Sequence, residues 1–283
     1  MSKKVLRVAK NIQGRDFIMG DVHGAFGLVL QGMQKVKFNA ARDRLFVPGD
    51  LIDRGSESHR CVKFLGQPYV FAVPGNHEKM FMDMYDEEKS PEDIQTFIEV
   101  LAGMNFNGMG WLASTTENFR QEMLAAFRKL PLAIELETER GLVGIVHADV
   151  PQGMHWNDFV RKLEAGDKTV TEFALGMVDE SRDRILRGRQ DGVPGIGRVF
   201  VGHTPQFGGV RRFGNVYAID TGACFGEAGK TPGAHLSMVN ACMKTEVLSA
   251  ARDPADTSLV DVRLPNTVST TLFSSLEDIA LLG

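Results

Sequence analysis

The sequence predicts an α/β fold, because a strand–loop–helix unit occurs three times in its first 85 residues. Apolar runs at 15–19, 44–47 and 69–73 have the length and composition of buried strands. A loop with glycine follows each run, and apolar residues at helical spacing follow each loop. In such folds, the loops after the carboxyl ends of strands carry the ligands. These three loops are therefore the first candidates for a functional site.

The other elements of the first half follow from the spacing of the apolar residues. Residues 1–14 are polar and are predicted to be a peripheral lead-in. Helices are expected at three places: 26–36, 57–65 and about 80–84. A charged break at residue 86 changes the pattern, and we predict a helical insertion or lid over about 86–130. Its expected helices lie on either side of a glycine-rich stretch, at 94–102 and 119–130.

In the second half of the sequence, the apolar pattern predicts mainly strands. A β-hairpin is expected from 132–137 and 142–146, and helical material fills 155–190. Further strands are expected at 198–201, 216–219, 236–239 and 246–248. The polar tail has only weak apolar alternation at 259–262 and is not assigned. We therefore predict one catalytic domain over 1–250 and a tail of unassigned role over 251–283.

Composition and charge narrow the function classes. With 283 residues, 43% of them hydrophobic and 24% charged, the chain has ordinary globular composition. Its formal net charge of −4 gives no electrostatic case for a nucleic-acid or membrane partner. Three cysteines without metal-type spacing favour a reducing compartment over a disulfide framework. The expected location is the cytoplasm, since neither a secretory signal nor a membrane-spanning apolar run is evident.

Metal-competent side chains gather where predicted strands end. They offer oxygen and imidazole donors without a thiolate, and they are Asp21, His23, Asp50, Asn76, His147 and His203. This mixture suits manganese, iron or zinc rather than calcium or a structural zinc. Six groups are too many for one tetrahedral site but fit two metals that share a carboxylate. The arginines Arg54 and Arg189 could bind phosphate oxygens beside them.

Five motifs in order resemble the metallophosphoesterase superfamily. They are Gly-Asp-Val-His-Gly at 20–24, Gly-Asp-Leu-Ile-Asp-Arg-Gly at 49–55, Gly-Asn-His-Glu at 75–78, His-Ala-Asp at 147–149 and Gly-His-Thr at 202–204. They are similar to the phosphoprotein phosphatase branch. The stretches at 107–111 and 219–223 resemble the group that includes the bacteriophage lambda protein phosphatase. The resemblance implies two mixed β-sheets packed as a sandwich and flanked by helices.

The resemblance also implies a role for each residue. Two divalent metals, manganese first and iron or zinc as alternatives, would activate a hydroxide that attacks phosphorus. Asp21, His23 and Asp50 would hold the first metal, and Asp50 would bridge to the second. Asn76, His147 and His203 would complete the second site, with Asn76 also contacting the substrate. His77 would protonate the leaving alkoxide while Asp53 holds its imidazole, and Arg54 and Arg189 would bind the phosphate.

Several assignments keep an alternative. The segment at 187–189 lacks the tryptophan that relatives carry near the phosphate-binding arginine, so Arg187 is the alternative to Arg189. The arginines between 182 and 189 could also form a solvated helix face. Asp149 could support a metal ligand or cap the end of the hairpin. Trp111 is expected to pack in the protein interior, with a substrate-facing lid role as the alternative.

The predicted function is a metal-dependent serine/threonine protein phosphatase that hydrolyses phosphomonoesters of proteins. The first alternative is a dinucleoside tetraphosphate hydrolase, whose branch typically has an alanine and an aspartate where this chain has Asp53 and Glu78. The second alternative is an inactive binding module on the same fold. A complete ligand set and the His77–Asp53 pair disfavour that module, because a scaffold needs no acid at the leaving group.

Overall fold

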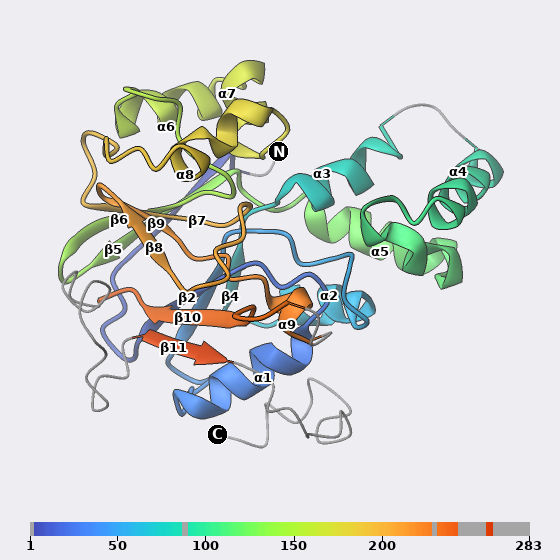
Figure 1. Ribbon diagram of the computed structural model, residues 1–283, viewed down its shortest axis with the longest axis horizontal. Helices are drawn as coiled ribbons and strands as arrows, with labels where there is room; N and C mark the ends of the chain where they lie inside the picture. Colours follow the sequence, from blue (N-terminus) through green and yellow to red (C-terminus); the bar gives the residue numbers. More distant parts are fainter. Residues whose placement is uncertain (1–2, 87–89, 228–230, 243–258, 263–283) are drawn as a thin grey trace.

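Two mixed β-sheets lie face to face at the centre of the molecule, and helices cover their outer faces (Figure 1). This arrangement confirms the predicted fold class. The computed structural model describes residues 3–86, 90–227, 231–242 and 259–262. The strand predicted at 246–248 lies outside these residues, as does most of the tail from 251. The division into a domain over 1–250 and a tail therefore stays a prediction.

The five-stranded sheet contains the three strands with which the chain's α/β units begin. Its parallel part is β2–β3–β4, and β10 and β11 add antiparallel strands at the β2 side. All four residues of β2 are buried, because a strand covered on both faces has no solvent side. The strands are β2 (Asp16–Met19), β3 (Arg44–Val47), β4 (Val70–Ala72), β10 (Leu236–Asn240) and β11 (Leu259–Val262).

The six-stranded sheet has the order β1–β5–β6–β7–β9–β8. The predicted hairpin is confirmed as the antiparallel pair β5–β6, whereas β6, β7 and β9 run parallel. The strands are β1 (Val5–Val8), β5 (Ala133–Thr138), β6 (Gly141–Ile145), β7 (Arg198–Val201), β8 (Arg211–Phe213) and β9 (Val216–Ala218). The prediction of a peripheral lead-in over 1–14 was wrong, because β1 pairs with β5 and buries Val5 and Val8.

Alternation along the strands builds three apolar layers. In β3, Phe46 points between the sheets while Leu45 and Val47 face the helices. In β7, Phe200 likewise points between the sheets, and its neighbours face the opposite helical layer. Successive side chains of a strand point to opposite faces, so each central strand holds both sheets and helices together.

The helices form two layers and one projection (Figure 1). The layer on the five-stranded sheet has α1 (Phe26–Lys35), η1 (Ser58–Arg60), α2 (Cys61–Leu65) and α9 (Ala223–Glu227). The layer on the six-stranded sheet has α6 (Trp156–Glu164), α7 (Lys168–Ala174), η3 (Asp179–Arg182) and α8 (Asp183–Leu186). The projection has α3 (Asn76–Asp83), α4 (Pro91–Gly103), η2 (Phe106–Ser114) and α5 (Glu117–Phe127). Helices were predicted in these regions of 26–130 and 155–190, except at η2, where a glycine-rich stretch between two helices was expected, and at α9.

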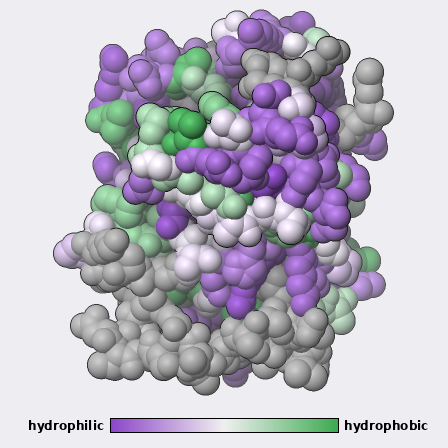
Figure 2. Space-filling model, turned by 90° about the vertical axis from the view of Figure 1, so that its right-hand side faces the viewer, coloured by the Kyte–Doolittle hydropathy of each residue, from purple (hydrophilic) through white to green (hydrophobic). Residues whose placement is uncertain are grey.

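The projection carries the predicted insertion and faces the viewer in Figure 2. Its surface mixes hydrophilic with hydrophobic side chains. Buried side chains of α4 and η2 belong to the same apolar cluster as strands β2 and β3, so the insertion packs on the domain rather than standing free. In the described part of the chain, no helix is long and apolar enough to cross a membrane.

Candidate metal centre

The structure brings all six predicted metal ligands to one edge of the two sheets. Asp21 and His23 follow β2, Asp50 follows β3, Asn76 follows β4, and two further histidines follow β6 and β7. An oxygen of Asp50 lies 3.3 Å from His23 Nε2 and the other 3.6 Å from His147 Nε2. His203 Nδ1 lies 2.8 Å from Asn76 Oδ1. The parallel strands β2–β4 and β6–β7 thus end at a common centre.

The backbone of these loops is strained. In the described residues, eight non-glycine positions have a positive φ, and five of them belong to the site: His23, Asp50, Asp53, Arg54 and His203. A side chain in the left-handed region costs about 1–3 kcal/mol unless the surroundings hold it, and such positions concentrate at functional sites. The clustering therefore marks these loops as functional independently of the motifs.

A buried carboxylate holds two of the strained loops together. Glu78 is fully buried and accepts hydrogen bonds from the backbone N–H groups of Asp50, Leu51 and Gly75 at 2.8–2.9 Å. Burial and the neighbouring Asp50 raise the pKa of Glu78 to about 7. A side chain at Gly75 would come within 2.1 Å of Asp50 Oδ1, so this approach requires glycine. The sequence singled out Glu78 only as a mark of the branch.

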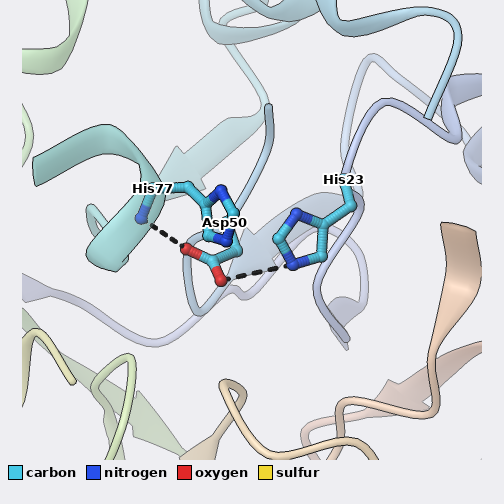
Figure 3. Close-up of side chains that lie close together, drawn as sticks. All are labelled: His23, Asp50 and His77. Carbon is cyan, nitrogen blue, oxygen red and sulfur yellow. Dashed lines mark hydrogen bonds and ion pairs between the residues drawn. The ribbon is translucent and has the colours of Figure 1, made fainter. Parts of the chain in front are cut away.

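Two ligand clusters share one carboxylate. Among the described residues, His23, Asp50 and His77 form one cluster, and Asp50, His147 and His203 form the other. Within each, the candidate ligand atoms lie within 4.8 Å of one another. Figure 3 shows Asp50 between His23 and His77, with one oxygen accepting from the His77 backbone N–H at 3.1 Å. Asp50 therefore occupies the position that a bridging ligand requires.

Hydrogen bonds aim the histidine lone pairs into the site. The Nδ1–H of His23 donates to the Ile52 carbonyl at 2.9 Å, and that of His147 donates to the Pro48 carbonyl at 2.8 Å. Because a carbonyl only accepts, Nδ1 carries the proton and Nε2 keeps its lone pair. Burial lowers the pKa of His147, and burial together with His147 lowers the pKa of His203. Both rings are thus kept neutral, as metal ligands must be.

Two buried atoms of the predicted ligands have no hydrogen-bond partner among the described residues. They are Asp21 Oδ1 and His203 Nε2, and a side chain at Gly202 would come within 1.9 Å of that Asp21 oxygen. Burial, followed by the negative charges of Asp220 and Asp50, raises the pKa of Asp21. Unpaired buried acceptors are costly, and a cation would satisfy them. These residues therefore fit divalent metals with nitrogen and oxygen ligands.

The predicted acid and its partner are in contact. His77 and Asp53 are both fully buried, with His77 Nδ1 2.7 Å from Asp53 Oδ2. Arg54 donates to Nε2 of His77 at 3.0 Å and to Nε2 of His23 at 2.9 Å. Its guanidinium also lies 5.9 Å from the centre of the Phe225 ring. Arg54 thus links His23 and His77 within the first ligand cluster.

The second guanidinium at the site is one that the sequence did not select. Arg189 hydrogen-bonds to Asp191 and Gln152, and Arg187 pairs with Asp183. Arg182 instead donates to the His203 carbonyl at 2.9 Å. Burial lowers the Arg182 pKa, and the nearby Asp50 opposes that effect. The role of Arg189 stays a prediction, but its contacts lie outside the two ligand clusters.

Asp149 and Arg184 form a buried ion pair behind the centre. Arg184 Nε lies 2.8 Å from Asp149 Oδ2, and neither side chain is more than 5% exposed. Burial raises the pKa of Asp149, although Arg184 opposes it. Since Asp149 follows His147 by two residues and Arg184 follows Arg182 by two, the pair ties together two loops of the site. Neither alternative considered for Asp149 included this arginine.

Comparisons with known proteins agree with this geometry. Residues 17–207 match the calcineurin-like phosphoesterase family. The chain is 31% identical over 216 residues to serine/threonine-protein phosphatase 1 of Salmonella typhimurium strain LT2, covering 74% of this chain and 87% of that protein. It is 27% identical over 153 residues to a symmetrical bis(5'-nucleosyl)-tetraphosphatase of Methylococcus capsulatus, covering 53% and 48%.

A solved structure shows the same fold. The protein serine/threonine phosphatase from Saccharomyces cerevisiae superposes with a TM-score of 0.52 at 18% identity, over 94% of this chain and 86% of that one. At this identity the likeness concerns the fold alone. The family match, in contrast, covers more than half of the 283 residues and contains all six ligand positions. The chain therefore belongs to the calcineurin-like phosphoesterase family.

Proposed function

We propose that this chain is a metal-dependent phosphatase that acts on phosphoserine and phosphothreonine residues of proteins. The observation that carries the proposal is the buried Asp53–His77 pair beside Arg54 and the two ligand clusters. A phosphomonoester needs a proton donor for its alkoxide leaving group, and this pair supplies one. The match to a bacterial protein phosphatase over 87% of that protein supports the same substrate class.

The proposed metal ligands are based on the two clusters, with Asp21 in place of His77 in the first and Asn76 added to the second. Asp21, His23 and Asp50 would hold one divalent ion, and Asp50, Asn76, His147 and His203 would hold the other. When bound, the two ions supply an activated water and stabilise negative charge on the phosphoryl oxygens. The mixture of imidazole and oxygen donors favours manganese, with iron or zinc as alternatives. A cytoplasmic location is part of the proposal, supported by three cysteines that form no disulfide in the described part of the chain.

The protein's own groups bind the phosphate and deliver the proton. Arg54 contacts His23 of one ligand cluster and Arg182 contacts the carbonyl of His203 in the other, and each guanidinium can donate two hydrogen bonds to phosphate oxygens. His77 acts as the acid in its doubly protonated form, in which Nδ1–H donates to Asp53 and Nε2–H carries the transferable proton. When the ester bond breaks, that proton passes to the departing serine or threonine oxygen.

A dinucleoside tetraphosphate hydrolase is the alternative supported by the relative in Methylococcus capsulatus. Asp53 and Glu78 argue against it, because both differ from the residues typical of that branch. Their contacts give the difference a physical meaning: Asp53 holds His77, and Glu78 binds three backbone N–H groups at once. An inactive binding module would leave the His77–Asp53 pair without a use.

A paired assay tests the proposal. With manganese added, a phosphoserine peptide should be hydrolysed faster than a dinucleoside tetraphosphate, and chelation should abolish both activities. Preference for the dinucleotide would support the alternative, and activity that survives complete metal removal would refute the metal-dependent mechanism. Hydrolysis of neither substrate by the metal-loaded protein would favour the inactive module.

The role of His77 has its own test. His77→Asn should lower kcat for the phosphoserine peptide about 10²–10⁴-fold, because general acid catalysis is lost. The decrease should be much smaller for p-nitrophenyl phosphate, whose leaving group needs no proton. Metal content measured on the same sample should match the wild type. Since His77 lies in one ligand cluster, loss of bound metal in the variant would mean that it is a ligand rather than an acid.

A further inference from the structure

Trp111 makes a contact that apolar packing does not explain. It lies in η2, within the predicted insertion, and its indole N–H donates to Asp53 Oδ1 at 2.8 Å. Trp111 is partly buried, whereas Asp53 is fully buried. The other oxygen of Asp53 faces His77 at 2.7 Å. The carboxylate is therefore shared between the acid and the insertion, each with an oxygen of its own.

The insertion touches the same loop at a second point. The backbone N–H of Arg54 donates to the Gly108 carbonyl at 3.3 Å. A side chain at Gly108 would come within 2.5 Å of that nitrogen, and its φ of 76° lies in the left-handed region. Glycine is therefore required for η2 to approach residues 53 and 54 this closely. Two consecutive residues of the site thus take their support from η2.

Asp53 needs such support because its surroundings hold it in a strained state. Its φ is 71°, and its backbone N–H donates to Ser58 Oγ at 2.9 Å. A hydrogen bond from a neutral donor to a buried carboxylate is charge-assisted and directional. Without the indole, Asp53 Oδ1 would lack its only hydrogen bond from a side chain in the described part of the chain. The carboxylate could then rotate and carry the His77 ring with it.

We propose that Trp111 is a positioning residue, which fixes the Asp53 carboxylate and through it the orientation of the His77 imidazole. This inference rests on the proposed role of His77 as the acid. Through Trp111, the helical insertion would contribute directly to the geometry of the site. The indole ring packs against the apolar cluster that includes strands β2 and β3, and that packing would be met equally by a phenylalanine. Only the N–H requires tryptophan.

Trp111→Phe tests the proposal, because it keeps an aromatic ring and removes the donor. With the metal-loaded enzyme, kcat for the phosphoserine peptide should fall about 10-fold, as expected for one lost bond to a charged group. KM should stay within about twofold, and p-nitrophenyl phosphate should be affected far less. Equal losses for both substrates would overturn the proposal, since a general distortion of the site would not depend on the leaving group.

The chain contains a matched control. Trp156, the second of its two tryptophans, also donates its indole N–H to a carboxylate, that of Glu135 at 2.8 Å. Its contacts lie in the apolar cluster of the six-stranded sheet, away from Asp53. Trp156→Phe should leave the ratio of the rates on the two substrates unchanged. A change in that ratio as large as that of Trp111→Phe would refute a specific role for Trp111.

Two further measurements separate this proposal from the proposed function. When Trp111→Phe is added to the Asp53→Asn variant, kcat for the phosphoserine peptide should not fall further. If the double variant instead loses the product of the two single losses in kcat, Trp111 acts without Asp53. In the nitrogen–proton NMR spectrum, Asp53→Asn should move one of the two indole signals and leave the other in place. If neither indole signal moves, Trp111 does not donate a hydrogen bond to Asp53. If the wild type hydrolyses no phosphomonoester, the proposed function fails while the NMR result still decides the contact.

Discussion

Buried acids lie at both ends of strands β2 and β3. The acids at one end are paired with arginines, and those at the other end are not. At the amino-terminal ends, Asp16 receives two hydrogen bonds from Arg44 at 2.7 and 2.9 Å, and Asp43 pairs with Arg15 at 2.6 Å. At the carboxyl-terminal ends, Asp50 faces histidine rings, and Asp21 Oδ1 has no hydrogen-bond partner within the part of the chain that the structure describes. Only the first group is neutralised by the protein itself.

The pKa directions of one acid from each end, Asp43 and Asp21, express the same contrast. Burial alone would raise the pKa of Asp43, but hydrogen bonds from the Arg15 side chain and from two backbone N–H groups outweigh it, and the pKa is lowered. For Asp21, burial and the neighbouring acids raise the pKa. An acid with its own arginine stabilises the fold, whereas an acid left without a counter-charge requires a ligand to supply one. Asp21 at the carboxyl-terminal end therefore destabilises the metal-free fold, and the same acid is one of the proposed metal ligands.

Of the substitutions considered, Asp50→Asn should have the largest effect on activity and on stabilisation by metal. Asp50 belongs to both ligand clusters, so Asp50→Asn should lower kcat/KM about 10³-fold or more and abolish the rise in Tm that manganese causes. The metal-free variant should differ little in stability from the metal-free wild type, because removing the charge relieves its repulsion of Asp21 and Asp220 but also loses its attraction to the nearby histidines, which lower the pKa of Asp50. Calorimetry with and without manganese measures both. A metal-free variant that unfolds at a much lower temperature would show that Asp50 is structural.

Removing Arg182, which we propose as a phosphate-binding arginine, should give the next largest effect. Arg182→Ala should lower kcat/KM about 10–10²-fold and weaken inhibition by inorganic phosphate, because hydrogen bonds to a charged group are lost. Arg189→Ala should change both by less than about twofold, since its partners are Asp191 and Gln152. Steady-state kinetics of the two variants side by side decides which arginine binds phosphate. The opposite ranking would restore the assignment made from the sequence.

The sequence predicted the parts of the molecule that are encoded locally. Each of the first three loops joins an apolar run to a glycine and a ligand within a few residues, so both the strands and the ligands could be found. Arg182 could not be selected, because η3 and α8 together span 179–186 and are too short to establish a periodicity. The bond between Trp111 and Asp53 joins residues 58 apart, and spacing carries no information about such contacts. Strand β1 was missed because its four residues include only two that are buried.

The smallest effect is expected at the opposite ends of the strands, where Asp43→Asn should reduce stability without touching catalysis. The free energy of unfolding at pH 7 should fall by about 1–3 kcal/mol, since Asp43 is buried and accepts bonds from Arg15 and Asn39. Because the folded-state pKa of Asp43 is lowered, its contribution is complete above the unfolded pKa of about 4 and is lost as the pH falls through the folded value. Denaturant unfolding of both proteins in chelator should therefore give a constant difference between pH 5 and 7 that shrinks below pH 4. The kcat of the metal-loaded variant should equal that of the wild type. A lowered kcat would mean that the two ends of the strands are coupled, and that the division between structural and functional acids is incomplete.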